Sequence, residues 1–398
     1  MKTLRLFFMT LCAGMALSAA AQQTVTIQGK VKFTDEGFKV QVYQRDGQDK
    51  KVLAEAPVNA DHTYKVTVPV SKPGTAIVDC GKWQSVMVWL EDEDMGIDFR
   101  GLDTAKIKIK NPPYVYIRAG KKNEVLNLMN FHDYRNYQSM IAASQSVYRA
   151  KIEDEKKSQN LASSLYDYLS DDNTAWMRYL VEHYADRTSV LAPMARLNDE
   201  KNADVIEPAL KQLETQSETA RQLVADYRKA KADAKEKRER MEDGKPAPNF
   251  SFQTEKGKTT SLDKYKGKVL VLDFWASWCG PCRQEVPNLK KYYEEFKDKG
   301  VEFLSVSIDA KKDAWTKALK EEAMPWKQGW TPDSGKEAMN TYQFSGIPFI
   351  ILIDKDGNIY RKHLRGEQIK EAIEDCLAGK KVNAPKKAVM SMGMMGAM

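Results

Sequence analysis

The segment Phe274-Trp-Ala-Ser-Trp-Cys-Gly-Pro-Cys282 continues an apolar, strand-like run that begins at Val269, and it ends with two cysteines three positions apart. If a helix begins at Cys279, then Cys279 and Cys282 lie on one face of it and their sulfur atoms can meet. Free backbone N–H groups and the positive end of the helix dipole would stabilise a thiolate there. One thiolate that attacks and one thiol that resolves the mixed disulfide suffice for disulfide exchange. The segment therefore predicts a redox-active pair.

A Cys-x-x-Cys pair is also half of a common type of zinc site, which is the main alternative. A structural zinc ion needs four Cys or His ligands. No second pair of this kind follows in the chain, and the nearest histidine, His363, is far downstream. We therefore predict no metal and no cofactor, and we favour redox chemistry.

The Cys-Gly-Pro-Cys sequence, preceded by Trp275 and Trp278, resembles the active site of thioredoxin. Residues 244–252 and 261–269 resemble the entry of the TlpA/ResA-type thiol–disulfide oxidoreductases, which are exported, membrane-facing relatives of thioredoxin. The resemblance covers residues 244–384. It implies a thioredoxin-like α/β domain that exchanges disulfides with protein substrates.

Asp273 is a carboxylate within the apolar run. Its neighbours Leu272 and Phe274 predict a strand covered on both faces, so we expect a buried carboxyl group with a raised pKa. The alternative is a carboxylate that faces solvent at a sheet edge. In thioredoxin the matching aspartate helps deprotonate the resolving thiol, so the resemblance implies that Asp273 is general base and acid for Cys282.

A second expected part of the site is the turn before the apolar strand that starts near Phe349. Proline is tolerated at the start of a strand because no ladder donor is lost there, and the residue pattern requires no more. In the thioredoxin fold a cis-proline at this position faces the disulfide, and the backbone before it pairs with bound substrate. The substrate-binding residues implied by the resemblance are Trp278, Gly280, Pro281, Ile347 and Pro348.

The remainder of residues 244–384 alternates between strand-like and helix-like segments, which independently favours an α/β sheet. The periodicity predicts strands over 301–308, 349–354 and 358–363, and helices over 313–323 and 367–377.

Residues 22–115 have a different pattern, with short runs of period-two alternation separated by turn residues. This pattern predicts an all-β domain, a sandwich or a barrel. The stretch resembles the small β-domain that often precedes the thioredoxin-like domain in exported proteins of Bacteroidetes-type bacteria. We expect a spacer or docking role rather than a ligand site, because no polar constellation stands out.

Residues 116–243 carry apolar residues at helical spacing and almost no glycine, which predicts a central helical region and connector. Glu207-Pro208 is expected to mark a break or a start within it. The overall fold class is therefore multidomain, with an all-β domain, a helical region and the thioredoxin-like domain at 244–384.

Residues 1–21 have the basic start, short apolar core and small residues of a cleavable signal peptide, with cleavage expected after Ala21. Its Cys12 lacks the small preceding residues of a lipoprotein site. We expect an exported or periplasmic protein that is not integral to the membrane. Removal of Lys2 and Arg5 lowers the net charge from +7 to +5, a mild and interspersed excess that predicts no nucleic-acid partner.

Residues 385–398 end in a methionine-rich stretch. Thioethers suit Cu(I), but a short tail without a neighbouring Cys or His favours a flexible end or a docking contact. Two further cysteines, Cys80 and Cys376, are either a disulfide between predicted domains or two buried small hydrophobes.

Three classes of function remain open. The first is exchange with protein thiols and disulfides in the reducing or isomerising direction, which implies a membrane electron donor if the protein reduces. The second is a peroxiredoxin-type thiol peroxidase, against which stand Ala276 and Trp275 where a threonine is expected. The third is a binding or assembly protein with incidental redox activity.

Overall fold

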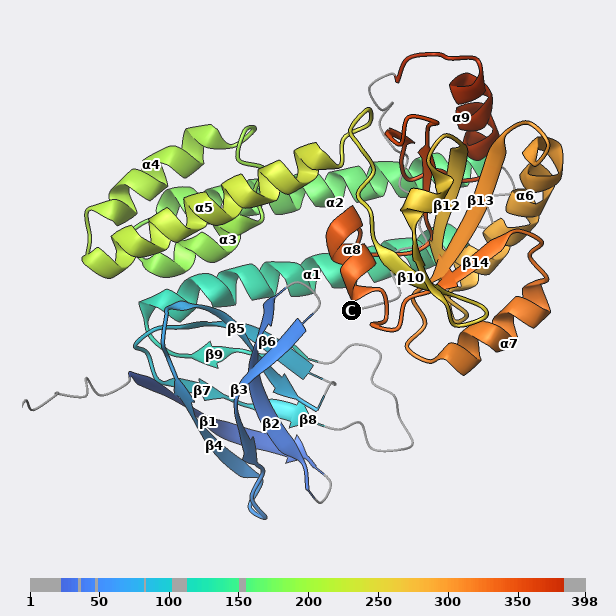
Figure 1. Ribbon diagram of the computed structural model, residues 1–398. Helices are drawn as coiled ribbons and strands as arrows, with labels where there is room; N and C mark the ends of the chain where they lie inside the picture. Colours follow the sequence, from blue (N-terminus) through green and yellow to red (C-terminus); the bar gives the residue numbers. More distant parts are fainter. Residues whose placement is uncertain are drawn as a thin grey trace, which may run out of the picture. The chain divides into compact units, whose positions relative to one another are not determined.

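The computed structural model describes residues 23–34, 37–46, 49–81, 84–101, 113–149 and 155–382 (Figure 1). The predicted signal peptide and the methionine-rich tail lie outside these residues. The chain divides into two compact units. The first comprises the described residues of Met1–Ala142 together with Leu169–Ala220, and the second those of Ala143–Tyr168 and Arg221–Met398.

The first unit contains two sheets, as the period-two alternation predicts. In strand β4 (Thr63–Pro69), Tyr64, Val66 and Val68 are buried while the residues between them face solvent. The five-stranded sheet has the order β4-β1-β7-β9, with β8 paired to β1; its other strands are β1 (Thr24–Phe33), β7 (Met95–Ile97), β8 (Phe99–Gly101) and β9 (Ile117–Arg118). The four-stranded sheet has the order β3-β2-β5-β6, from β3 (Asp49–Pro57), β2 (Lys39–Asp46), β5 (Gly74–Cys80) and β6 (Gln84–Leu90).

The central part of the chain is helical, as predicted. Its helices are α1 (Lys121–Arg149), α2 (Glu155–His183), η1 (Thr188–Val190), α3 (Leu191–Ala195), α4 (Ala203–Glu214) and α5 (Glu218–Arg240). The expected break at Glu207-Pro208 is wrong, because Pro208 lies inside α4, where it forgoes one intrahelical hydrogen bond. The chain instead turns at 215–217, and the Ser217 hydroxyl accepts a hydrogen bond from the Ala220 N–H (3.0 Å), which caps α5.

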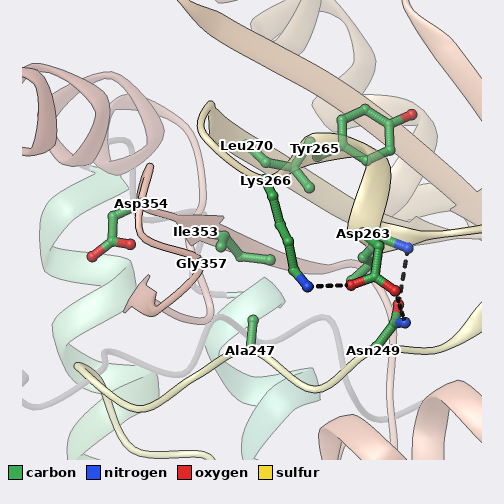
Figure 2. A pocket seen from close by; sticks show the side chains of 10 residues that line it. Ala247, Asn249, Asp263, Tyr265, Lys266, Leu270, Ile353, Asp354 and Gly357 are labelled. Carbon is green, nitrogen blue, oxygen red and sulfur yellow. Dashed lines mark hydrogen bonds and ion pairs between the residues drawn. The ribbon is translucent and has the colours of Figure 1, made fainter.

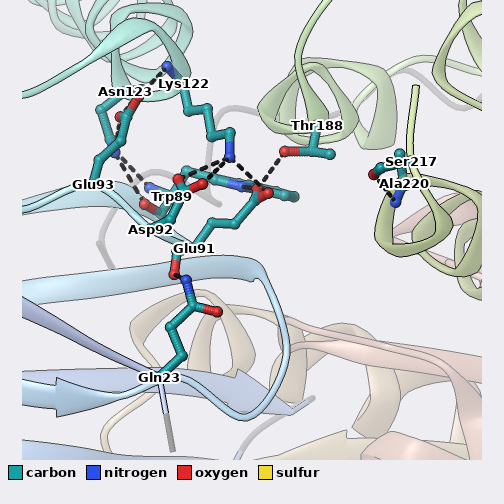
Figure 3. A network of polar contacts seen from close by, with 10 residues as sticks. All are labelled: Gln23, Trp89, Glu91, Asp92, Glu93, Lys122, Asn123, Thr188, Ser217 and Ala220. Atoms are coloured by element: carbon teal, nitrogen blue, oxygen red, sulfur yellow. Dashed lines mark hydrogen bonds and ion pairs between the residues drawn. The ribbon is translucent and has the colours of Figure 1, made fainter.

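A polar network in the first unit fixes the start of α1 against the end of β6 (Figure 3). The Glu93 carboxylate accepts hydrogen bonds from the backbone N–H groups of Lys122 (2.9 Å) and Asn123 (3.1 Å), which the first turn of a helix leaves unpaired. The Asn123 side chain accepts from the Trp89 N–H (2.8 Å) and donates to the Trp89 carbonyl (3.0 Å). Lys122 Nζ forms an ion pair with Glu91 (2.7 Å). The network is a structural junction whose donors and acceptors satisfy one another.

The second unit is built on a seven-stranded sheet with the order β11-β10-β14-β13-β12-β15-β16. The central strand β12 pairs in parallel with β13 and antiparallel with β15, and all seven of its residues are buried. The strands are β10 (Ser251–Thr254), β11 (Thr259–Ser261), β12 (Val269–Trp275), β13 (Val301–Ser307), β14 (Lys327–Trp330), β15 (Phe349–Ile353) and β16 (Ile359–Arg361).

Two apolar cores cover the two faces of this sheet. Successive residues of β12, such as Val271 and Leu272, belong to opposite cores, so the strand is covered on both sides as predicted. Helices α6 (Gly280–Phe296), α7 (Lys312–Glu322) and α9 (Glu367–Leu377) contribute to the core that contains the cysteines, and α8 (Lys336–Tyr342) contributes to the other. The short helix η2 (Leu262–Tyr265) precedes β12.

The expected fold class is confirmed: a sheet-rich N-terminal region, central helices and a C-terminal α/β domain. The exact domain boundaries stay a prediction. Within the described residues, no helix is both long enough and apolar enough to cross a membrane.

Candidate active site

Cys279 and Cys282 are joined by a disulfide at the N-terminus of α6, with their Cα atoms 5.3 Å apart. Cys279 is the N-cap residue, so the helix begins one position later than predicted, and Cys279 Sγ accepts a hydrogen bond from the Cys282 N–H at 3.2 Å. Pro281 lies in the first turn, where its missing N–H costs no hydrogen bond. The backbone therefore directs a donor at the sulfur that would carry the negative charge of a thiolate.

The disulfide lies just below a surface made by its own neighbours. Cys279 and Cys282 are 4% and 3% exposed, whereas Trp278 is 68% exposed. Gly280 and Pro281 are also exposed, and a Cβ atom added at Gly280 would meet nothing within 4 Å. A large aromatic side chain left in solvent beside a reactive group is a natural contact for a partner chain.

Asp273 is buried, as predicted, on β12 ahead of the cysteines. Its Oδ2 accepts a hydrogen bond from the Ser305 hydroxyl at 2.9 Å. Desolvation raises the pKa of Asp273 to about 7, although the Ser305 hydrogen bond and the charge of Arg365 act to lower it. A carboxyl group with a pKa near neutrality can both take up and release a proton under physiological conditions.

The Ile347–Pro348 peptide bond is cis, which is the isomer that the resemblance implied. Pro348 is buried, and the half-buried Ile347 packs against the core that includes both cysteines. The structure thus joins the turn before β15 and the disulfide to one core.

Two charged residues of this region were missed by the sequence analysis. The Arg365 guanidinium donates hydrogen bonds to the Pro348 carbonyl and to the Leu364 carbonyl (2.6 Å). Glu285, one turn after Cys282 on α6, accepts from the Gly366 N–H at 2.8 Å. Residues 365 and 366 therefore connect the cis-proline turn to the helix that carries the cysteines. The i, i+3 spacing from Cys282 could have indicated Glu285, but no local pattern indicates Arg365.

A third missed residue, Asp309, holds the loop between β12 and α6. Its carboxylate accepts hydrogen bonds from the N–H (2.9 Å) and the hydroxyl (2.6 Å) of Ser277 and from the Ser307 hydroxyl (2.7 Å). Its carbonyl accepts from the Trp330 indole N–H at 2.7 Å. Ser277 lies two positions before Cys279, so these bonds fix the approach of the chain to the disulfide.

Two further cysteines lie in the part of the chain that the structure describes, and neither is in a disulfide there. Cys80, buried in β5, and Cys376, on α9, are both free thiols. Burial raises the pKa of Cys80 to about 12 and that of Cys376 to about 11. Both are protonated at neutral pH and are therefore poor nucleophiles.

A small pocket of about 50 Å³ lies elsewhere in the second unit (Figure 2). Leu270, near the start of β12, and Ile353, its partner on β15, supply part of its wall, and Asp263 and Lys266 form an ion pair beside them. It lies at the end of β12 opposite the disulfide, and none of the predicted site residues lines it. The part of the chain that the structure describes contains no cluster of three or more His, Cys, Asp or Glu residues that could hold a metal ion.

Comparison with known proteins gives matches to this part of the chain. A family model described as Redoxin matches residues 242–376. The thiol-disulfide oxidoreductase ResA of Bacillus thuringiensis subsp. konkukian is 38% identical over 141 residues, which cover 35% of this chain and 80% of that protein. ResA of Bacillus subtilis is 30% identical over 138 residues, 35% of this chain and 75% of that protein.

Among solved structures, the thioredoxin domain of a thiol-disulfide oxidoreductase from Bacteroides vulgatus is similar. It is 38% identical, with a TM-score of 0.33, and the match covers 34% of this chain and 96% of that domain.

Proposed function

Since the chain belongs to the ResA family of thiol–disulfide oxidoreductases, we propose that it is exported and exchanges disulfides with protein substrates through Cys279 and Cys282. The observation that carries the proposal is the Cys279–Cys282 disulfide capping α6 beside the exposed Trp278. A helix N-terminus lowers the pKa of a thiol placed there, and the exposed ring offers a surface to a substrate chain.

The reaction in the reducing direction starts from the dithiol form. The Cys279 thiolate attacks a substrate disulfide, forms a mixed disulfide and releases one substrate thiolate. Cys282 then gives its proton to Asp273, and the resulting thiolate attacks Cys279 Sγ and displaces the second substrate thiolate. The enzyme keeps the Cys279–Cys282 disulfide, and Asp273 releases to solvent the proton that it took from Cys282. The substrate has gained two electrons and takes up two protons from solvent.

We propose that Trp278, Gly280, Pro281, Ile347 and Pro348 bind the substrate chain. Gly280 and Pro281 are exposed between the cysteines, and Ile347 packs against the core that includes them. The hydrogen bond from Arg365 supports this arrangement, because it engages the carbonyl of Pro348. Among the hydrogen bonds that the structure describes for this turn, none engages the carbonyl of Ile347.

The preferred direction is reduction or isomerisation, because the Gly-Pro dipeptide between the cysteines resembles that of the reductant thioredoxin. A reductant outside the cytoplasm must be recharged, so the proposal includes a membrane electron donor. Export rests on residues 1–21, and N-terminal sequencing of the mature protein is expected to begin at Gln22.

The reduction potential of the Cys279–Cys282 pair tests the direction. The protein is equilibrated in dithiothreitol or glutathione buffers, and the fraction of the reduced form is read by alkylation and mass spectrometry. A value near about −270 mV supports a reductant, whereas a value near about −120 mV marks an oxidant and overturns the proposed direction.

Trapping of the mixed disulfide tests the roles of the two thiols. The variant Cys282→Ser should accumulate a covalent complex with a disulfide protein such as insulin, because the attack by Cys279 proceeds and its resolution is lost. Cys279→Ser should form none. The control variant Cys376→Ser, which removes a thiol with a raised pKa, should exchange at the wild-type rate.

A thiol peroxidase is the competing function. The position three residues before Cys279 is Ala276, which is fully buried and has no hydroxyl group to offer peroxide. We therefore expect hydrogen peroxide consumption to be at least about a hundredfold slower than disulfide exchange, because a hydroxyl donor that would polarise peroxide is absent at this position. Comparable rates would favour the peroxidase.

A further inference from the structure

A row of polar side chains crosses the buried sheet on the side of the cysteines. Asp273 of β12 is in register with Ser305 of β13, and Ser305 is in register with Gln328 of β14. Their exposures are 4%, 0% and 5%, although Val271 and Phe303, two positions earlier on the same strands, belong to the apolar core. Residues in register share a face of the sheet, so polar groups interrupt a surface that is otherwise apolar. A buried polar group is costly unless its hydrogen bonds are made.

The hydroxyl group of Ser305 acts both as a hydrogen-bond acceptor and as a hydrogen-bond donor. It accepts a hydrogen bond from the Trp326 indole N–H at 2.9 Å and donates one to Asp273 Oδ2 at 2.9 Å. An indole N–H can only donate, so the Ser305 oxygen accepts there and its single hydrogen is left for the carboxylate. The two hydrogen bonds therefore run in one direction, from Trp326 through Ser305 to Asp273. Two hydrogen bonds that point the same way strengthen one another in a buried site.

Charged groups from other elements also face Asp273. The negative charge of Glu285, on α6, raises the pKa of Asp273, and the positive charge of Arg365, before α9, lowers it. The larger cause of the raised pKa is desolvation, and the larger opposing cause is the Ser305 hydrogen bond. The same core contains Cys279 and Cys282, whose thiols titrate in the reduced form, and the tyrosines Tyr292 and Tyr360. Ser305 is thus the side chain best placed to favour the ionised carboxylate.

We propose that Ser305 and Trp326 are positioning residues for disulfide exchange: they hold the carboxyl group of Asp273 in one orientation and favour its ionised form, which takes the proton from Cys282. The inference rests on the proposed function, in which Asp273 is that proton acceptor. In the step concerned, the S–H bond of Cys282 breaks, an O–H bond forms on Asp273, and the electron pair left on sulfur attacks Cys279 Sγ and expels the substrate thiolate.

The test follows a single turnover of the reduced full chain with glutathione disulfide. The concentration is set where the rate no longer depends on it, so that the rate reports the second, intramolecular step. Formation of the Cys279–Cys282 disulfide is measured from pH 5 to pH 9 by rapid quenching and alkylation. On the acid side of this profile, the pH at which the rate is half its maximum reports ionisation of the proton acceptor. This pH is the midpoint compared between variants below.

Ser305→Ala should move this midpoint to higher pH by about one unit, since a hydrogen bond to a charged group is worth at least that much. The rate at pH 6 should fall about tenfold, and the rates at pH 9 should converge. Ser307→Ala is the matched control, because Ser307 is a fully buried serine on the same strand whose hydroxyl bonds to Asp309 instead. Its midpoint should equal that of the wild type.

Two more variants separate positioning from mere packing. Ser305→Thr keeps the hydroxyl group and should restore the wild-type midpoint. Trp326→Phe keeps an aromatic ring but loses the N–H donor, and it should move the midpoint in the same direction as Ser305→Ala by a smaller amount. An unchanged midpoint in both Ser305→Ala and Trp326→Phe would overturn the inference, even if the rates fall.

Asp273→Asn distinguishes failure of this inference from failure of the proposed function. Loss of the acid-side midpoint in Asp273→Asn, with no shift in Ser305→Ala, refutes the role of Ser305 and leaves Asp273 as the proton acceptor. An unaltered pH profile in Asp273→Asn refutes the proposed role of Asp273, and the inference falls with it.

Discussion

A single buried carboxyl group has opposite effects on stability and on chemistry. In the folded protein burial raises the pKa of Asp273 from 3.8 to about 7, so the folded state binds a proton that the unfolded chain releases between these values. The folded state therefore loses stability as the pH rises from about 4 to about 7, and the loss is complete above that range. The same group is useful to catalysis because it titrates near neutrality.

Asp273→Asn should consequently stabilise the oxidised protein. We expect the free energy of unfolding at pH 8 to increase by up to about 4 kcal/mol, because three pKa units correspond to about that energy and asparagine can still accept the Ser305 hydrogen bond. Urea unfolding at pH 8 and at pH 4 checks this. The two proteins should be equally stable at pH 4, and a difference that does not depend on pH would contradict the explanation.

Glu285→Gln should shift the pH dependence of exchange in the direction opposite to Ser305→Ala. The negative charge of Glu285 raises the pKa of Asp273, and glutamine removes this charge while its oxygen can still accept from the Gly366 N–H. The acid-side midpoint of the exchange rate should therefore move to lower pH, by up to about one unit for the loss of one nearby charge. The single-turnover pH profile measures it, and a shift to higher pH would show that the charge acts by another route.

At the scale of elements, the position of the disulfide depends on the loop between β12 and α6. Asp309→Ala removes three hydrogen bonds to side chains and backbone, and it leaves the Ser277 N–H without its acceptor. We expect a loss of about 2–4 kcal/mol in the free energy of unfolding and a slower exchange at every pH. Urea unfolding and insulin reduction measure the two effects. Asp313 is an exposed aspartate whose carboxylate, among the hydrogen bonds described for it, bonds only to the backbone at the start of its own helix. Asp313→Ala should therefore change neither the free energy of unfolding nor the exchange rate by much.

The elements that the sequence predicted are those with long or distinctive local patterns. The apolar run from Val269 indicates β12, and the cysteine pair indicates the start of α6. Strand β14 and helix α8 were not predicted, because Lys327–Trp330 and Lys336–Tyr342 are too short for a period to be recognised. Their places in the fold are set by long-range pairing with β13 and packing against Phe274.

The same distinction applies to the site. Cys279, Cys282 and the burial of Asp273 follow from local sequence. The contact of Ser305 with Asp273 depends on the register of β12 against β13, which joins residues 32 positions apart. The contact of Arg365 with Pro348 depends on how the chain returns after β16. No short sequence motif encodes either contact, so neither could be predicted from this single sequence.

At the scale of the whole molecule, the division into two units predicts that stability and redox chemistry can be altered separately. Asn123→Ala removes hydrogen bonds to both backbone groups of Trp89, which lie in the first unit with Asn123 itself. We expect a loss of about 2–3 kcal/mol in the stability of that unit because the Trp89 N–H and carbonyl lose their partners. The reduction potential of the Cys279–Cys282 pair should not change.

Two measurements on the same variant test this separation. Limited proteolysis should cut the first unit faster, and alkylation mass spectrometry should give the wild-type potential. Asn130→Ala, on the same helix, loses a single bond to the Met87 carbonyl and should have a smaller effect on proteolysis. A changed potential in Asn123→Ala would mean that the two units are energetically coupled.

The open space around Gly280 has a consequence for how this protein could diverge. Because a Cβ atom at that position would meet nothing within 4 Å, a side chain can begin there without a clash with the fold. Replacement of one exposed residue between the two sulfurs can then alter the redox poise while the core beneath stays intact. Descendants of such a gene could move between donating and accepting electrons in few mutational steps, with the scaffold inherited unchanged.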